Sequence, residues 1–389
     1  MIDRPRPTRR GLIRAATGLA AAAGTGLTSP KIAEAASGDC PDEASQIEPF
    51  WGAHQAGITT VPVQRHSYAA TFDAVAKSRD EVVAMLRRWA AAAARMAGGE
   101  PAQALGNDAA IRAGDSGEAL GLAPARLTVT FGFGTGLFSK DGVDRYGLAG
   151  RRPPALVDLP RFDGDELIEA LTGGDLSVQA CADDPQIAFH AVRQLGALAR
   201  GAAEPRWAQT GFVSVGAGPQ QRPRNLMGFR DGIGNPSVHD PAAMDQFVWV
   251  GDEGPDWMRG GSYVVMRRIR VALEHWDRMP LGFQEQTFGR QKYSGAALGS
   301  KDELDPPDLN AIGEDGDPVI PENAHIRLAR AASNDGAKIL RRPYSYNDGI
   351  NEVTERWEPW RRRKEYDAGL FFVCYQRDPR SGFIKIFER

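Results

Sequence analysis

The run Leu127-Thr128-Val129-Thr130-Phe131 decides the fold class, because it alternates apolar and polar side chains and is rich in β-forming residues. This pattern predicts a strand in a sheet with one covered face, and Gly132 and Gly134 mark its end. Upstream, the sequence predicts a strand over residues 69–75 and a helix over 81–97. Asp80 is the expected N-cap of that helix.

Further strands and helices continue the pattern on both sides of residue 219. We expect a short helix at 163–171, a strand at 176–181 and a helix at 185–200, then strands at 211–215, 262–271 and 370–375. A helix through Arg278 follows the 262–271 strand. Similar units in each half indicate two stacked α+β modules with a boundary near Pro219. Residues 289–323 and 348–364 are polar or broken by Gly and Pro, and are expected to be surface loops or walls of an access channel.

The first 35 residues are unlike the rest of the chain. Thr8-Arg9-Arg10-Gly11-Leu12-Ile13-Arg14 precedes an Ala/Gly/Leu-rich stretch over 15–27 and Ala33-Glu34-Ala35, a pattern that predicts a twin-arginine signal peptide over 1–35 and a linker over 36–47. The apolar run is too short and too rich in alanine to be a membrane anchor. We therefore expect recognition by the twin-arginine export machinery and no stable membrane span after the signal is removed. Periplasm, cell envelope and secretion remain open as destinations.

Composition narrows the function classes. Hydrophobic residues make up 42% of the 389 residues, enough for a sizeable core. Without residues 1–35 the chain has 41 basic and 48 acidic residues, so nucleic acid is not an expected partner. Cys40, Cys181 and Cys374 show no CxxC spacing, which argues against a zinc site or a disulfide framework. Cys181 and Cys374 are expected in buried strands.

The strongest chemical signal is Asn225-Leu226-Met227-Gly228-Phe229-Arg230-Asp231-Gly232-Ile233-Gly234-Asn235-Pro236. Three glycines surround one acidic residue, and glycine lets backbone approach a ligand closely. An Asp-Gly turn with a solvated carboxylate is the simpler alternative, since such turns are common.

Together with two later segments, this loop resembles the dye-decolourising (DyP-type) haem peroxidase family. Gly228-Phe229-Arg230-Asp231-Gly232 matches the family's GxxDG motif. His325, in Ala324-His325-Ile326-Arg327-Leu328, matches its proximal haem ligand, and Arg341, in Ile339-Leu340-Arg341-Arg342-Pro343, matches its distal arginine. The resemblance covers nearly all of the mature chain and is greatest to the exported, deferrochelatase/peroxidase-like branch. Arg330-Ala331-Ala332 departs from the Asn-Pro pair common after the proximal histidine in that branch.

The resemblance implies an α+β fold of two stacked ferredoxin-like modules with antiparallel sheets, of the dimeric α+β barrel type. The modules are expected over 48–218 and 219–389, with one haem b per chain in the C-terminal module. The implied reaction reduces hydrogen peroxide through a ferryl intermediate and oxidises dyes, phenols, metal ions or a protein donor.

Each matched residue has an implied role. His325 would hold the iron as axial ligand, because a neutral imidazole suits haem iron. Asp231 would shuttle a proton between the peroxide oxygens, and Arg341 would stabilise developing charge. A carboxylate can work in mildly acidic solution, where a histidine base would be protonated, so an acidic activity optimum is expected. The resemblance also implies haem contacts from the backbone of Gly232, Ile233 and Gly234, from Arg341, and from Arg342 and Arg327 at the propionates.

Several expectations stay open at this level. Asp378, or else Asp367, is the candidate carboxylate supporting the proximal histidine. Tyr344, Tyr346, Trp357 and Trp360 are candidate electron relays, although aromatic residues near a core more often serve packing. A haem-binding or iron-extracting protein is the alternative function. A hydrolase using Asp231 and His325 has little support, because the chain lacks a nucleophile motif such as GxSxG.

Overall fold

A computed structural model of the protein describes residues 46–106, 114–214, 222–354 and 360–389. The expected signal peptide, most of the linker, Cys40, the boundary near Pro219 and Trp357 lie outside these residues. The strands form one antiparallel sheet. Its order is β2 (Thr128–Phe133), β3 (Leu176–Ala182), β1 (His66–Ala74), β4 (Ala203–Phe212), β7 (Tyr344–Thr354), β8 (Arg362–Gln376) and β5 (Tyr263–Arg270), with β6 (Leu340–Arg341) paired to β8. The α+β class is therefore confirmed. Among the described residues, no helix combines the length and apolar character needed to cross a bilayer.

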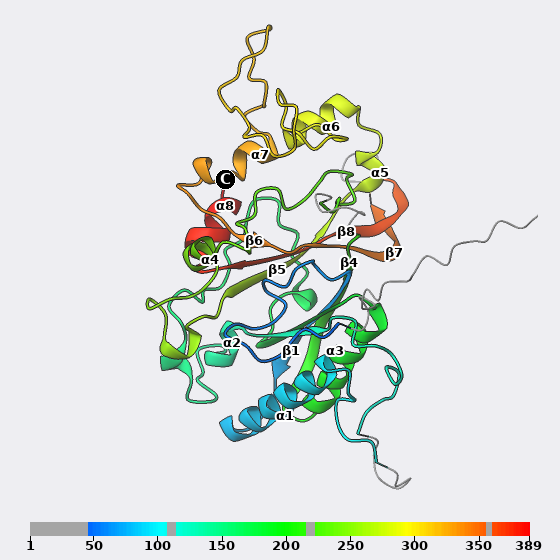
Figure 1. Cartoon of the computed structure of the whole chain (residues 1–389), viewed down its shortest axis with the longest axis vertical. Helices are drawn as coiled ribbons and strands as arrows, with labels where there is room; N and C mark the ends of the chain where they lie inside the picture. Colours follow the sequence, from blue (N-terminus) through cyan, green and yellow to red (C-terminus); the bar gives the residue numbers. More distant parts are fainter. Residues whose placement is uncertain (1–45, 107–113, 215–221, 355–359) are drawn as a thin grey trace, which may run out of the picture. The chain divides into compact units, whose positions relative to one another are not determined.

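The N-terminal half of the sheet is covered by two helices on one face (Figure 1). Trp89 of the first helix is 1% exposed and stacks on Phe131 at a ring separation of 5.6 Å, so the apolar face of the 127–131 run is covered as predicted. Thr128 and Thr130 on the opposite face are also buried, at 1% and 8% exposure, so the expectation of a single covered face was wrong. The elements of this half are β1 (His66–Ala74), α1 (Arg79–Ala97), β2 (Thr128–Phe133), α2 (Thr135–Phe138), β3 (Leu176–Ala182), α3 (Pro185–Ala199) and β4 (Ala203–Phe212).

Three other local predictions in this half were wrong. Ser78, and not Asp80, caps α1, because its hydroxyl accepts the N–H of Glu81. Residues 163–171 form only a 3-10 turn at Glu169–Leu171. The strand expected at 211–215 is β4 and runs earlier, over Ala203–Phe212. Pro205 conceals it in the sequence, because this proline sits where a β-bulge interrupts the pairing with β1.

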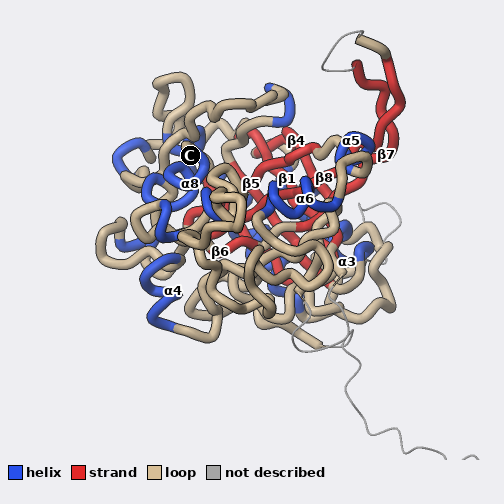
Figure 2. The backbone as a smooth tube through the Cα atoms, turned by 90° about the horizontal axis from the view of Figure 1, so that it is seen from above, coloured by secondary structure: helices blue, strands red, loops and turns tan. Residues whose placement is uncertain are grey.

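The C-terminal half is organised around β8 (Arg362–Gln376), which pairs with three other strands. Residues 289–324 contain turns and isolated bridges only, as expected for a loop. Residues 348–364 were predicted to be a surface loop or channel wall, but 348–354 belong to β7 and 362–364 to β8, which form the arms of a hairpin (Figure 2). The other elements are α4 (Pro241–Phe247), β5 (Tyr263–Arg270), α5 (Leu273–Trp276), α6 (Leu281–Phe288), α7 (His325–Leu328), β6 (Leu340–Arg341), β7 (Tyr344–Thr354) and α8 (Lys385–Phe387).

The two halves of the sheet meet at a single residue pair, Phe212 of β4 opposite Ser345 of β7. Gly211 permits this contact, since a Cβ there would lie 2.5 Å from Cβ of Tyr344. Side chains from both halves share one core, in which the Tyr375 hydroxyl donates to Gln179 Oε1 at 2.7 Å. Cys181 in β3 and Cys374 in β8 are buried, as predicted.

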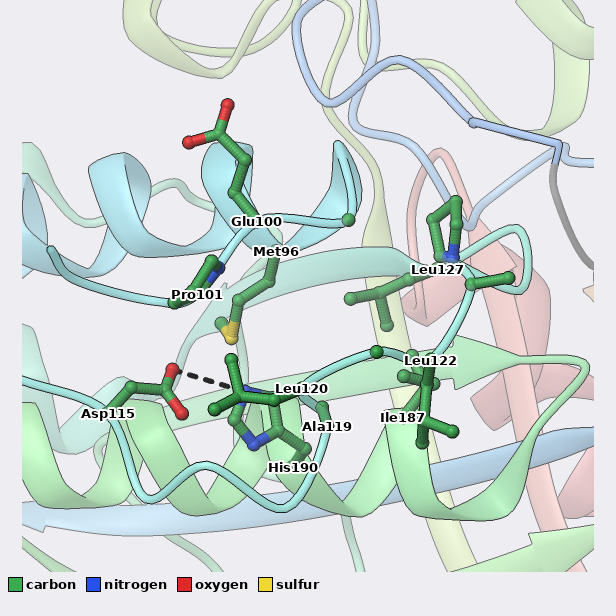
Figure 3. A pocket seen from close by; sticks show the side chains of 14 residues that line it. Met96, Glu100, Pro101, Asp115, Ala119, Leu120, Leu122, Leu127, Ile187 and His190 are labelled. Carbon is green, nitrogen blue, oxygen red and sulfur yellow. Dashed lines mark ion pairs between the residues drawn. The ribbon is translucent and has the colours of Figure 1, made fainter. Parts of the chain in front are cut away.

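A buried ionic cluster holds the segment after residue 113 against α3. His190 of α3 has its Nε2 3.4 Å from Asp115 Oδ2 and its Nδ1 3.2 Å from Glu118 Oε1, and Figure 3 shows Asp115 beside His190. Burial alone would raise the pKa of Glu118, but hydrogen bonds from Ser116, its own backbone and His190, with the charge of His190, lower it to about 2.

Replacing Glu118 with Gln should make stability less dependent on pH. Since the pKa of Glu118 falls from its ordinary 4.5 to about 2 on folding, its contribution is complete above pH 4.5 and disappears as the pH drops towards 2. Glu118→Gln should lower the free energy of unfolding at pH 7 by at most about 3 kcal/mol, and by much less at pH 3. Urea titrations at both pH values test this, with Glu100→Gln at an exposed ion pair as control. An equal deficit at both pH values would contradict it.

Candidate functional site

The loop carrying Asp231 is a fixed structure. The N–H of Asn225 donates to the carbonyl of Phe229 at 2.9 Å, and the N–H of Asp231 donates to the carbonyl of Pro223 at 2.9 Å. Gly228 and Gly232 have φ values of +87° and +80°, which only glycine adopts without strain. Phe229 is 2% exposed and stacks on Phe288 at 4.0 Å, which anchors the loop beside α6. Asp231 is therefore not part of a free solvated turn.

Asp231 and Arg341, far apart in the sequence, form an ion pair as expected of a shared site. Arg341 Nη1 lies 3.2 Å from Asp231 Oδ1, and both side chains keep some exposure, 24% and 14% respectively. The same oxygen accepts the N–H of Gly232 at 2.6 Å. Among the described residues, Oδ2 of Asp231 has no hydrogen-bond partner, so it remains available for a proton.

Arg341 is held on a second side by Asn235. The Asn235 Oδ1 accepts from Arg341 Nε at 3.2 Å and from its backbone N–H at 3.3 Å, while Asn235 Nδ2 donates to the Arg341 carbonyl at 2.7 Å. The sequence prediction quoted Asn235 within the motif but gave it no role. Its amide ties the Asp231 loop to β6.

His325 begins the short helix α7 and packs edge-on against Phe288 at 5.8 Å. Gly289 allows this packing, because a Cβ there would lie 2.3 Å from Cγ2 of Ile326. His325 is exposed to solvent, yet desolvation by the surrounding protein lowers its pKa, and Arg341 and Arg290 lower it further against the opposing charge of Asp231. The lowered pKa favours the neutral imidazole, and the charges that act on it place His325 near Asp231, Arg341 and Arg290. These four residues are together called the recess.

Arginines that the sequence prediction did not single out surround the recess. Glu303 pairs with Arg222 and Arg230, and Arg222 Nη1 also donates to the Gly232 carbonyl at 3.1 Å. Burial lowers the pKa of Arg290; Glu303 opposes this, whereas Arg330, Arg341 and Arg222 lower it further. The positive charges of five arginines are thus opposed by only two carboxylates, Asp231 and Glu303, and this excess favours an anionic ligand. The arginines are Arg222, Arg230, Arg290, Arg330 and Arg341. Charge spacing in the sequence offered no signal for this cluster, since its members span more than a hundred positions.

Two other arginines are engaged elsewhere. Arg342 is 4% exposed and donates to the Thr60 carbonyl at 2.7 Å and to Gln64 Oε1 at 3.2 Å. Arg327 donates to the carbonyls of Leu309, Ile320 and Pro321 and so fastens the long loop. Their hydrogen bonds to neighbouring protein groups leave them poorly suited to hold haem propionates.

The expected carboxylate partner of His325 is not in place. Asp378 binds Arg380 through both oxygens, at 2.6 to 3.2 Å, and Asp367 binds Arg268 and Asn351. Within the described chain, the His325 ring makes no hydrogen bond. The structure therefore brings His325, Asp231 and Arg341 together but leaves Asp378 and Asp367 apart from them.

The recess fits haem b on its donor chemistry. His325 offers a neutral imidazole, and the arginine excess suits two propionates. A Cβ at Gly234 would have only Arg341 Nη2 within 4 Å, at 3.9 Å, so the backbone at 232–234 leaves room for a flat ligand. His325, Gly232, Ile233, Gly234 and Arg341 are thus placed where they could hold the group.

Asp115, Glu118 and His190 form the one close group of possible metal ligands in the described part of the chain. Each ring nitrogen of His190 faces a different carboxylate, and Arg193 Nη1 lies 3.1 Å from the same Glu118 oxygen that His190 approaches. Each member of the group thus lies within ion-pair distance of another member or of Arg193.

The candidate relay residues have different surroundings. Tyr344 and Tyr346 are 1% and 0% exposed, and Arg268 stacks over the Tyr346 ring at 4.3 Å. Trp360 is 56% exposed. The two tyrosines serve packing at the junction of the sheet halves, and their part in electron transfer stays a prediction.

Comparison with known proteins covers both halves of the chain. The family model for the N-terminal part of Dyp-type peroxidases matches residues 55–213, and the model for the C-terminal part matches residues 222–389. A dye-decolorizing peroxidase of Thermobifida fusca is 41% identical over 79% of this chain and 67% of its own length. A deferrochelatase of Escherichia coli is 35% identical over 98% of this chain and 88% of its own.

Solved structures agree with this match. A DyP-type peroxidase from Streptomyces coelicolor superposes with a TM-score of 0.78 at 41% identity, covering 89% of this chain and 88% of that one. Ferric DtpA from Streptomyces lividans gives a TM-score of 0.78 at 40% identity with the same coverage. The fold, the Asp231, Arg341 and His325 recess, and these matches together show that the chain belongs to the DyP-type peroxidase family of oxidoreductases.

Proposed function

We propose that this protein binds one haem b on His325, reduces hydrogen peroxide to water, and oxidises dyes, phenols or other one-electron donors. The observation that carries the proposal is the Asp231 and Arg341 ion pair, whose charges act on the nearby His325. When bound, haem iron supplies the redox chemistry. The chain itself supplies proton transfer, fixed charge and a desolvated pocket.

Asp231 would move the proton. Its Oδ1 is occupied by Arg341 and the N–H of Gly232, whereas Oδ2 is free among the described residues. Oδ2 would take a proton from one peroxide oxygen and return it to the departing oxygen, which leaves as water. Because Oδ1 is held twice, the carboxylate keeps one orientation during both transfers.

Arg341 would stabilise negative charge as the oxygen–oxygen bond breaks. A guanidinium stays protonated and therefore cannot serve as the base. Its Nη1 is directed to Asp231, and Nη2 has no partner within the described residues, so it can donate to a ligand.

Haem binding with iron extraction is the second candidate, since relatives named deferrochelatase match almost the whole chain. Removal of iron from haem has no evident need for a paired carboxylate and arginine, whereas heterolytic peroxide cleavage does. Release of iron-free porphyrin from the haem-loaded protein without peroxide, detected by fluorescence, would favour this second function.

We also propose that the protein is exported through the twin-arginine route, on the basis of residues 8–14, 15–27 and 33–35. Insertion of haem before export would explain the use of a route that carries folded proteins. Cell fractionation of an Arg9→Lys/Arg10→Lys variant tests this, and the variant is expected to remain inside the cell.

Asp231→Asn and Arg341→Ala should each slow the reaction with peroxide. Loss of the proton shuttle is expected to lower kcat/KM for peroxide by about 10²- to 10⁴-fold, and loss of the charge by about 10²- to 10³-fold. Stopped-flow absorption of the haem-loaded variants after one equivalent of peroxide measures this. Asp256→Asn, at an exposed aspartate, is the control. Unchanged rates in both site variants, with haem bound, would rule out the proposed roles.

His325→Ala should lose stable haem binding, because the recess would retain its arginines but not its iron ligand. Haem retained after gel filtration, measured by Soret absorption, tests this. His239→Ala is the matched control, since His239 is an exposed histidine in the same half. Full haem retention in His325→Ala would show that another residue holds the iron.

Activity should peak in mildly acidic solution. The proposed base is a carboxylate, which can accept a proton in mildly acidic solution where a histidine base would already be protonated. Desolvation lowers the pKa of His325, which favours its neutral form in the same range. A profile of kcat/KM for peroxide from pH 4 to 8 tests this. A maximum above neutrality with collapse in acid would contradict a carboxylate base.

A further inference from the structure

Asn235 contacts Arg341 at three points, more than any other described side chain does. Two of these contacts fix the backbone of β6. Asn235 Nδ2 donates to the Arg341 carbonyl at 2.7 Å, and the Arg341 N–H donates to Asn235 Oδ1 at 3.3 Å. The third, from Arg341 Nε to the same Oδ1 at 3.2 Å, fixes the guanidinium. A side chain that only tied two segments together would not need this third contact.

The third contact determines which way the guanidinium faces. Asn235 holds Nε on one side and Asp231 holds Nη1 at 3.2 Å on the other. With two nitrogens engaged, the planar guanidinium has little freedom to rotate, and Nη2 is directed to the side where a Cβ on Gly234 would meet it at 3.9 Å. That is the open backbone of the loop.

We propose that Asn235 is a positioning residue for Arg341, whose amide keeps Nη1 on Asp231 and Nη2 available to an anionic ligand in the recess. Asp231 and Asn235 belong to one rigid loop and are four positions apart. The loop therefore fixes the position of the Asp231 carboxylate relative to the Arg341 guanidinium. Without the hydrogen bond at Nε, the Arg341 side chain would adopt other rotamers, and its charge would spend less time near the ligand. This inference rests on the proposed function.

Fluoride binding to the haem-loaded ferric protein measures the effect without turnover. Fluoride is a small anion whose affinity depends on a hydrogen-bond donor near the open haem face, and its binding is followed by visible absorption at fixed pH. Arg341→Ala should weaken fluoride binding by about 10-fold or more, and Asn235→Ala by about 3- to 10-fold. In the Asn235→Ala/Arg341→Ala double variant, no further loss beyond Arg341→Ala is expected.

The double variant separates positioning from simple support. Arg341→Ala keeps the backbone N–H and carbonyl that Asn235 binds, so a purely structural role of Asn235 would lower fluoride affinity equally with and without the guanidinium. Equal losses in both backgrounds, or no loss in Asn235→Ala, would overturn the proposal. If Arg341→Ala itself has no effect while haem is bound, the proposed role of Arg341 fails instead, and with it this inference.

A matched control is available in the same loop. The Asn225 Oδ1 accepts two backbone N–H groups, from Met227 at 3.1 Å and Phe229 at 3.2 Å, and has no contact with Arg341. Asn225→Ala should lower thermal stability. Any change that it causes in fluoride affinity should be the same with and without the Arg341 guanidinium. If Asn235→Ala does not fold, Asn235→Ser, a milder truncation that also removes the reach to Nε, replaces it with the same expected results.

Discussion

Strand β8 carries the antiparallel ladders on which the C-terminal half depends. Its residues pair with β5 on one side and with β6 and β7 on the other. The pairing of Arg341 with Cys374 fixes the position of the Arg341 backbone along β8. β6 is only two residues long, so these ladder bonds and Asn235 together determine where the guanidinium lies. The same β8 side chains, Phe371 and Tyr375, fill the core shared with the N-terminal half. The same strand, β8, therefore both holds the sheet together and positions Arg341.

The recess combines groups that oppose one another electrostatically. Desolvation and arginine charge lower the pKa of His325, which favours the neutral imidazole that the proposed iron ligand needs, while the charge of Arg341 pairs with Asp231. Glu303 reduces the repulsion among Arg222, Arg230 and Arg290 but does not cancel it. Such an excess of partly buried positive charge is costly for the protein alone, and it supports the proposed binding of an anionic cofactor.

Prediction from the sequence succeeded where local patterns suffice and failed where partners are remote. Apolar alternation located β2, and an apolar stripe located α3, because the spacing of apolar residues follows the face that is buried. The β7–β8 hairpin was missed because its outer arms are exposed and polar, so backbone pairing rather than burial defines them. Arg342 was suggested as a propionate contact beside Arg341, and Asp378 as the partner of His325 just beyond the last strand. Their actual partners are Thr60 and Gln64 for Arg342 and Arg380 for Asp378.

The sequence by itself determined the fold class, the family and the identities of His325, Asp231 and Arg341, because motif residues and their order are written in the chain. Only the tertiary structure decided that Asp231 and Arg341 are 3.2 Å apart, that Asn235 holds Arg341, and that Arg222, Arg290 and Glu303 belong to the same recess. The physical reason is that ion pairs and hydrogen bonds between side chains act over a few ångströms of space. Residues more than a hundred positions apart meet only after the ladders of the sheet have set their distance.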